Sequence, residues 1–175
     1  MNYLMRGIGV LTAVGTISLL AFSLPPNEAR GDGGDDLMPR QTHQAWQQEC
    51  GSCHLAYPPA LLPKASWQRL MAGLDNHFGE NASLDPATRA DILRFLEAHA
   101  ADSGTSRMGG KVMQRMDTKT VPLRITETTW FVRKHDEVPA SAWRRKSVGS
   151  AANCAACHRQ AEKGHYDDDT VRIPR

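Results

Sequence analysis

In the first half of the chain, apolar residues recur three or four positions apart, which is the spacing of one face of an α-helix. The pattern predicts three helices, over residues 42–54, 66–79 and 85–101. Thr42, Ser66 and Asp85 are suitable N-caps for them, and Pro86 suits a first helical position. The predicted buried faces comprise Trp46, Trp67, Leu70, Met71, Leu74, Phe78, Ile92, Leu93, Phe95 and Leu96.

The second half of the chain has a different pattern. Residues 119–132 are rich in β-branched and aromatic side chains but interrupted by Pro122, which predicts one or two short strands or an extended segment. A further helix is predicted over residues 148–161. We therefore predict a mainly α fold with an N-terminal helical domain over residues 41–102. A glycine- and serine-rich linker over residues 103–111 then leads to a small, less regular C-terminal domain over residues 112–175.

The N-terminus has the composition of a targeting segment. An uncharged run of 17 residues, Ile8 to Leu24, follows the positively charged Arg6, and Ala21-Phe22-Ser23 fits a cleavage site. We predict that residues 1–23 are a signal peptide, and the alternative is an uncleaved anchor over residues 7–24. The run is at the short end for a spanning helix, which needs about 20 apolar residues. Residues 24–40, rich in proline, glycine and aspartate, are predicted to be a flexible lead.

Composition narrows the class of protein. The 175 residues are 41% hydrophobic and 23% charged, as in a globular protein, but only 6% aromatic. Two halves of about 65 residues would have thin cores at that composition, unless another group fills them. Loss of residues 1–23 lowers the formal net charge from +2 to +1, because Arg6 is removed. This balance gives no basis for nucleic-acid binding.

All four cysteines lie in two pentapeptides of the form C-x-x-C-H, which is the attachment signature of c-type haem. These are Cys50-Gly51-Ser52-Cys53-His54 and Cys154-Ala155-Ala156-Cys157-His158. On a helix, the two cysteines and the histidine share a face. The thiols can then form thioethers with the porphyrin vinyl groups while the imidazole ligates the iron. Disulfides would leave both histidines unexplained, and a zinc site would need cysteine pairs closer than 104 residues apart. Export agrees with haem attachment, which occurs outside the bacterial inner membrane.

The opposite face of each iron decides the function. His54 and His158 are the proximal ligands, and an open distal face would permit gas binding or peroxide chemistry. A distal histidine or methionine would close the iron and leave an electron-transfer site. His77 is the best distal candidate for the first haem, because it lies on an apolar face at a helix end, 23 residues after His54. His135 is the best candidate for the second, 23 residues before His158 and after an apolar aromatic segment.

Other ligands stay open at this point. His43 is the reserve, particularly for ligation between domains, whereas His99 and His165 are expected at the surface. The thioether alternatives are Met71, Met108, Met113 and Met116. Ligation of both irons by two histidines is the favoured arrangement, ahead of one His/Met site or one open site.

Longer runs around these residues carry a family resemblance, of which His77-Phe78-Gly79-Glu80-Asn81-Ala82 is the most particular. The others are Glu49–His54, Tyr57–Pro63, Ser66-Trp67, Arg124–Thr126, Trp130-Phe131, His135, Cys154–His158, Ala161-Glu162, Gly164 and Ile173-Pro174. Over residues 45–174 the chain resembles the bacterial dihaem cytochromes c of the DHC type. The resemblance implies a domain similar to class I cytochrome c, then a less regular haem domain with short extended segments. It also implies two bis-histidine haems, without deciding which iron His77 and His135 serve.

The expected function is therefore periplasmic electron transfer by two covalently bound haem c groups, and not catalysis. The resemblance implies redox protein partners, such as a small oxygen-binding haem protein or a membrane cytochrome b. No membrane span is expected in the mature chain unless the N-terminal segment is retained. The alternative is a peroxidase-like dihaem enzyme or a gas-binding protein with one open iron. The well-placed histidines and the short chain argue against it.

Overall fold

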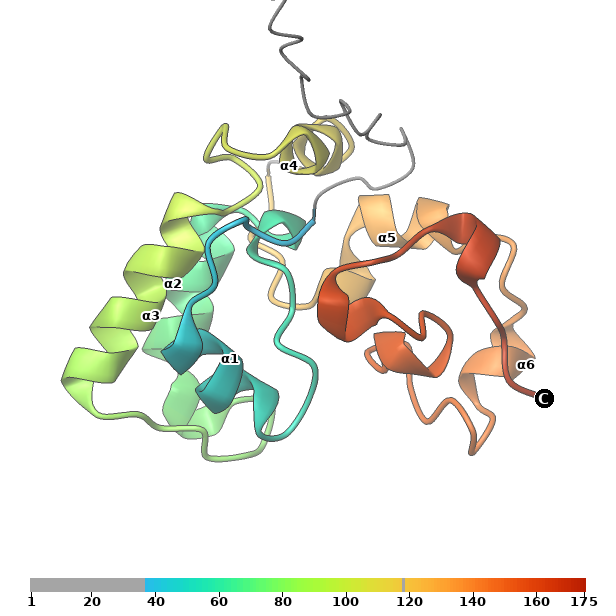
Figure 1. Cartoon of the computed structure of the whole chain (residues 1–175), viewed down its shortest axis with the longest axis horizontal. Coiled ribbons are helices and arrows are strands. Elements are labelled where there is room, and N and C mark those ends of the chain that lie inside the picture. The colour runs from blue at the N-terminus through green and yellow to red at the C-terminus, as the bar shows by residue number, and fades with distance from the viewer. Residues whose placement is uncertain (1–36, 118) are drawn as a thin grey trace, which may run out of the picture. The chain divides into compact units, whose positions relative to one another are not determined.

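The computed structural model describes residues 37–117 and 119–175, which belong to one compact unit (Figure 1). The predicted signal peptide and residues 24–36 of the predicted lead lie outside the described residues. No described helix has the length and apolar character needed to cross a membrane. The described part of the chain contains helices and no β-strand, which confirms the mainly α fold class.

Three helices form the first core. They are α1 (Gln44–Gly51), α2 (Lys64–Ala72) and α3 (Pro86–Ala98), and α2 lies alongside α3 (Figure 1). Their apolar faces bury eight residues against one another: Trp46, Leu62, Trp67, Met71, Ile92, Phe95, Leu96 and Ala100. The first and third helices lie close to their predicted ranges, but the second ends at Ala72 instead of residue 79, and Phe78, predicted to be buried, is 45% exposed. The buried Trp67 indole donates to the Pro59 carbonyl (2.9 Å), so its polar atom is satisfied inside this core.

The helix starts are set by caps that the sequence predicts only in part. Asp85 caps α3 as predicted, accepting from the amides of Ala87 (3.0 Å) and Thr88 (3.1 Å). The other two predicted caps are wrong. His43 caps α1, because its Nδ1 accepts from the Trp46 amide (3.1 Å), and α2 begins after a proline at position 63.

Helix α4 (Arg107–Met113) lies largely within the segment predicted as a linker. Its buried face joins a second cluster, made of Leu37, Leu61, Ala101, Met108 and Val112. Gly109 permits this packing, because a Cβ at that position would lie 2.7 Å from the Ala101 carbonyl oxygen. The division into two haem domains stays a prediction.

The rest of the chain folds into short helices and single 3₁₀ turns. The helices are α5 (Thr129–Lys134) and α6 (Ala140–Trp143). The turns are η3 (Ile125–Glu127), η4 (Cys154–Ala156), η5 (Ala161–Lys163) and η6 (Asp168–Thr170), in addition to η1 (Pro59–Leu61) and η2 (Leu74–Asn76) in the first half. The buried apolar residues in this part are Phe131, Ala142, Val148 and Ala161. Such a sparse interior agrees with a less regular second half.

Two secondary-structure predictions for this half of the chain are wrong. Residues 125–127 and 129–134 are helical instead of extended, because the Thr128 hydroxyl accepts from the Phe131 amide (3.1 Å) and starts α5. The β propensity of this segment has no effect, since no neighbouring strand is present among the described residues. The helix predicted over residues 148–161 is broken into turns, beginning with Gly149 at a φ of 78°.

Candidate functional site

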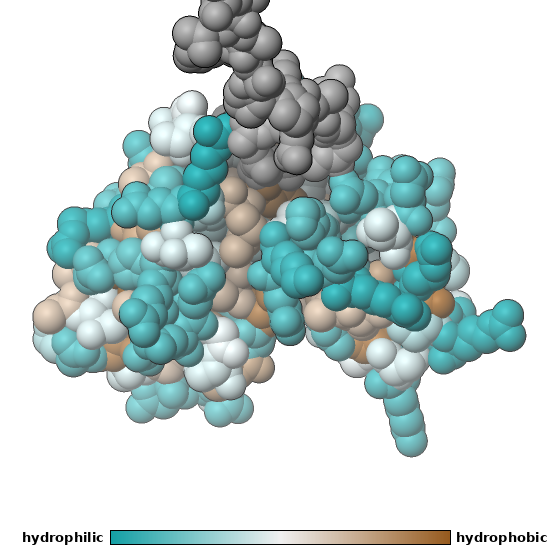
Figure 2. Space-filling view, viewed as in Figure 1, coloured by the Kyte–Doolittle hydropathy of each residue, from teal (hydrophilic) through white to brown (hydrophobic). Residues whose placement is uncertain are grey.

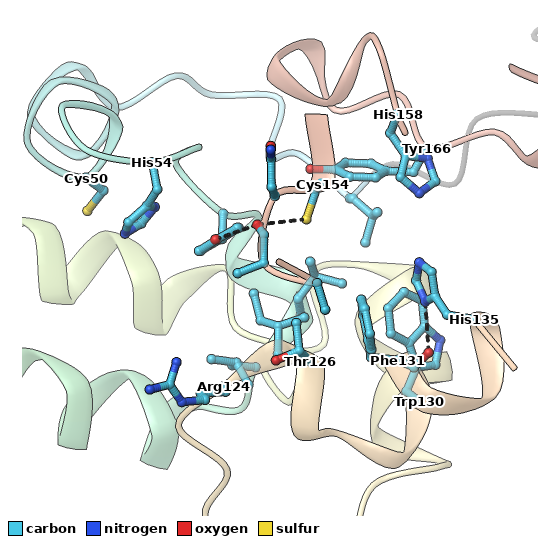
Figure 3. Close-up of a pocket in the computed structure, with 18 of the residues that line it drawn as sticks. Cys50, His54, Arg124, Thr126, Trp130, Phe131, His135, Cys154, His158 and Tyr166 are labelled. Carbon is cyan, nitrogen blue, oxygen red and sulfur yellow. Dashed lines mark hydrogen bonds between the residues drawn. The ribbon is translucent and has the colours of Figure 1, made fainter. Parts of the chain in front are cut away.

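A cavity of about 1400 Å³ brings together every predicted site residue. Its lining includes Cys50, Cys53, His54, His77, His135, Cys154, Cys157 and His158. Pockets for one small ligand usually measure about 300–1,000 Å³, so this cavity has room for more than one. Figure 2 shows apolar residues gathered between the α1–α3 side of the molecule and its C-terminal segments, on a face that is otherwise mostly hydrophilic. Figure 3 shows His54 on one side of the cavity and His135 and His158 on the other.

The first attachment motif begins in the last turn of α1 and continues past its end. Cys50 is half-buried and Cys53 exposed, and neither forms a disulfide. Burial, with a smaller effect of the neighbouring Glu49 carboxylate, raises the pKa of Cys50 to about 11, so the thiol is protonated at neutral pH. The His54 Nδ1 lies 2.7 Å from the Leu55 carbonyl oxygen and donates to it in the Nδ1–H tautomer. The Nε2 lone pair of His54 is then available to a metal.

His77 stands at the start of a tight four-residue turn. Its amide donates to the Glu80 carbonyl (2.7 Å), and the Glu80 amide donates back (3.2 Å). Phe78 and Gly79 complete the turn with positive φ angles of 57° and 103°. A left-handed phenylalanine costs roughly 1–3 kcal/mol, and such strain is typical of functional sites. The Arg124 guanidinium lies 3.8 Å from the Phe78 ring centroid, a cation–π contact that holds this ring.

The first histidine pair, His54 and His77, has ring centroids 6.2 Å apart and an interplanar angle of 24°. Burial is the main cause that lowers the pKa of His77, and the His54 ring and the Arg124 guanidinium lower it further. His77 is therefore neutral at physiological pH, with a lone pair that can bind a metal.

The second histidine pair, His135 and His158, also has ring centroids 6.2 Å apart, but at an interplanar angle of 81°. His135 ends α5, and its Nδ1 lies 2.9 Å from the Phe131 carbonyl oxygen, which again leaves Nε2 for a metal. The Phe131 ring stacks on it at 4.0 Å and 22°. The Nδ1 of His158 is buried without a partner among the described residues, and burial is the main cause that lowers the pKa of His158.

The second pair of thiols lies at the two ends of turn η4, which begins at Cys154 and has Cys157 as its C-cap. Burial raises the pKa of Cys154 to about 11, and it also raises the pKa of Cys157. A hydrogen bond from the His158 amide to the Cys154 carbonyl (2.8 Å) closes the motif. The motif therefore adopts a compact turn without the longer helix that the sequence predicts.

Both histidine pairs fit a haem iron. Two imidazoles that ligate one metal from opposite sides have centroids roughly 6.2 Å apart. This value follows from an imidazole–metal bond of about 2.0 Å and a five-membered ring with sides of about 1.33 Å, whose radius is about 1.1 Å. Each pair is spaced at that value, and each lies beside one C-x-x-C motif.

The remaining candidate ligands lie elsewhere or have other partners. His43 caps α1, and its Nε2 lies 3.1 Å from an Asp91 carboxylate oxygen, away from the cavity. His99 packs on the Phe95 ring at 4.9 Å, and His165 is exposed at the cavity edge. Met71 and Met108 line the cavity but are buried in the two core clusters, whereas Met113 and Met116 do not line it.

Three aromatic residues contact the histidine pairs without having been predicted to do so from the sequence. The Tyr57 ring stacks on His54 at 4.7 Å, the Tyr166 ring lies 5.2 Å from His158, and the Trp143 ring lies 5.9 Å from His135. Tyr57 follows its histidine by three residues, a signal that the sequence does contain. The other two depend on tertiary packing.

Zinc and disulfide alternatives find no support in the described residues. None of the four cysteines is paired, and no cluster of three or more His, Cys, Asp or Glu side chains is placed to hold a metal ion there. The site instead offers two separate pairs of imidazoles and two pairs of thiols.

Comparison with known proteins decides the family. The dihaem cytochrome c (DHC) family profile matches residues 46–166. The chain belongs to the dihaem cytochrome c family. It is therefore a dihaem c-type cytochrome, an electron-transport protein with two haem c groups.

Solved structures agree with this assignment. The chain is 48% identical to a diheme cytochrome c from Rhodobacter sphaeroides, covering 71% of this chain and 97% of that one, with a TM-score of 0.65. It is 44% identical to the diheme cytochrome sb-DHC from Shewanella baltica OS155, covering 74% and 91%, with a TM-score of 0.61. The search of curated proteins found no match.

Proposed function

We propose that this dihaem cytochrome is a periplasmic electron carrier whose irons are each ligated by two histidines. His54 and His77 serve the first haem, and His135 and His158 serve the second. The observation that carries the proposal is the 6.2 Å spacing of the ring centroids in both pairs, which matches ligation from opposite sides of one iron. When bound, haem c supplies reversible one-electron transfer.

The chain's own groups attach and orient the haems. Cys50 and Cys53 supply thioethers for the first haem, and Cys154 and Cys157 for the second. In the Nδ1–H tautomers, His54 and His135 would donate to nearby backbone carbonyls, which would leave each Nε2 to hold the iron and would raise the basicity of the ligand. The protein therefore presents rigid ligands, which suit electron transfer with little reorganisation.

The rival function, a peroxidase-like enzyme or a gas-binding protein, needs one iron with an open distal face. A histidine stands opposite the proximal ligand in both pairs, so the geometry favours two closed irons. We accordingly propose a carrier without catalytic activity.

The N-terminus and the family support the proposed location, and the proposed partner is a further expectation. Residues 1–23 would direct export, consistent with a family whose members are typically exported. The partner would be another redox protein, such as a small oxygen-binding haem protein or a membrane cytochrome b. A transient interface of less than about 1,200 Å² is expected for such an encounter.

Substitution of the two distal histidines tests the proposal. His77→Ala and His135→Ala should each convert one of the two haems to a high-spin form that binds carbon monoxide when reduced. Both variants should retain two covalently attached haems. His99→Ala is the matched control, because His99 lies outside the cavity, and it should leave both haems low-spin. A fully low-spin spectrum in either distal variant would show that the assigned ligand is wrong.

A further inference from the structure

Tyr57 contacts both halves of the site. Its ring lies nearly parallel to the His54 imidazole, with centroids 4.7 Å apart and an interplanar angle of 17°. This stacking restricts rotation of the imidazole about its own axis. The plane of the first proximal ligand therefore depends on a residue outside the attachment motif.

The Tyr57 hydroxyl reaches the segment just before the second attachment motif. It donates to the Ala152 carbonyl oxygen at 2.8 Å, two residues before Cys154. The Cys154 thiol contacts the same carbonyl at 3.7 Å, which is the dashed line that ends on its sulfur in Figure 3. The Tyr57 bond joins residues that lie 95 positions apart in the chain.

We propose that Tyr57 is a positioning residue shared by the two haem sites. Its ring sets the plane of the His54 imidazole, and its hydroxyl fixes the Cys154 attachment segment against the first site. The inference rests on the proposed bis-histidine function, since it assigns His54 to the first iron. With both haems bound, Tyr57 would thereby influence the transfer of one electron from the reduced to the oxidised haem, with no bond formed or broken and no proton transferred.

Tyr166 provides the comparison within the same cavity. Its ring lies 5.2 Å from His158, and Figure 3 shows its hydroxyl on the side of the cavity where Cys154 lies. Its hydroxyl is buried but has no hydrogen-bond partner among the described residues. Removing that hydroxyl breaks no hydrogen bond among the described residues, whereas removing the hydroxyl of Tyr57 breaks its bond to the Ala152 carbonyl.

Three variants of the holoprotein separate the roles of ring and hydroxyl. Tyr57→Phe keeps the ring and removes the hydrogen bond, Tyr57→Leu removes both, and Tyr166→Phe is the control. Less than one electron per molecule is introduced by flash photolysis of a soluble photoreductant. Freeze-quenched electron paramagnetic resonance then reports how fast the electron redistributes between the haems, and the oxidised samples report the ligand planes at each iron.

The expected results differ among the variants. Tyr57→Phe should slow redistribution by roughly threefold or more and leave the low-spin signal of the first haem unchanged. Tyr57→Leu should slow it at least as much and also shift that signal, because the imidazole plane is released. In Tyr166→Phe, the rate of electron redistribution between the haems should lie within about 1.5-fold of that in the unmodified protein.

A wild-type redistribution rate in Tyr57→Phe, or an equal slowing in Tyr166→Phe, would overturn the assignment. An unchanged low-spin signal of the first haem in Tyr57→Leu would overturn the claim that the Tyr57 ring sets the plane of the His54 imidazole. A high-spin iron in the unmodified protein is a different outcome, because it contradicts the proposed function itself.

Discussion

Substitution by alanine should have opposite effects on protein stability at two adjacent glycines in α4. A Cβ at Gly109 would lie 2.7 Å from the Ala101 carbonyl oxygen and 2.9 Å from its Cα. Ala101 cannot easily withdraw, because its amide donates to the Leu62 carbonyl (2.9 Å) and it is buried in the second cluster. At Gly110, in the same helix, a Cβ would meet no atom within 4 Å.

The difference between the two alanine variants isolates the packing effect. Both replacements gain about 1 kcal/mol of helix propensity, which cancels in the comparison. Gly110→Ala should therefore stabilise the protein by roughly 0.4–1 kcal/mol. Gly109→Ala should be less stable than Gly110→Ala by about 1–3 kcal/mol, the usual effect of overpacking a dense core.

Denaturant unfolding of the holoprotein, followed by far-ultraviolet circular dichroism, measures this difference. The denaturant dependence should be equal in the two variants, so that the midpoints report stability alone. Stabilities of the two variants within about 0.5 kcal/mol of each other would refute the close packing of α4 on Ala101.

Three further predictions concern the site. Thr128→Ala should lower the free energy of unfolding by about 1–2 kcal/mol in a denaturant titration, because the buried hydroxyl caps α5 and donates to the Ile125 carbonyl (2.7 Å). Thr128→Ser should retain most of the stability, and an equal loss in both variants would argue against the cap. Cys157→Ser should leave one haem bound through a single thioether or lost, and an unchanged number of thioether-linked haems by mass spectrometry would refute attachment there. The oxidised protein should give two distinct low-spin resonance signals, with greater anisotropy at the second histidine pair, whose rings are nearly perpendicular. A single signal for both haems would contradict the two ligand geometries.

Short sequence patterns were sufficient to predict those features whose structure depends on residues close together in the chain. The start of α3 follows from Asp85 and Pro86, because a side-chain oxygen and a fixed φ act within one helical turn. The two C-x-x-C-H motifs likewise place thiols and an imidazole together without long-range contacts. The family resemblance and these motifs were enough for the cofactor and the fold class.

The second half could not be predicted in the same way, since its elements are too short to show a periodic pattern. A threonine hydroxyl at position 128 decides between strand and helix for the residues that follow it. The segment after Val148 contains alanines that favour a helix, but Gly149 adopts a left-handed conformation and starts a series of turns. These outcomes depend on single contacts, which the helix or strand propensity of the residues does not take into account.

The pairing of ligands is the part of the site that needs the structure. Spacing along the chain favours His77 for the first iron and His135 for the second without settling the pairing, whereas the fold puts each beside one proximal imidazole. The contact between Tyr57 and Ala152 spans 95 residues, and nothing local to either residue indicates it.

Near-infrared magnetic circular dichroism of the fully oxidised holoprotein tests the central claim most directly, because the energy of its charge-transfer band identifies the pair of axial ligands. The account predicts that the whole low-spin intensity, equivalent to two haems, has the bis-histidine position. A methionine–histidine band or a high-spin band from either haem would contradict it.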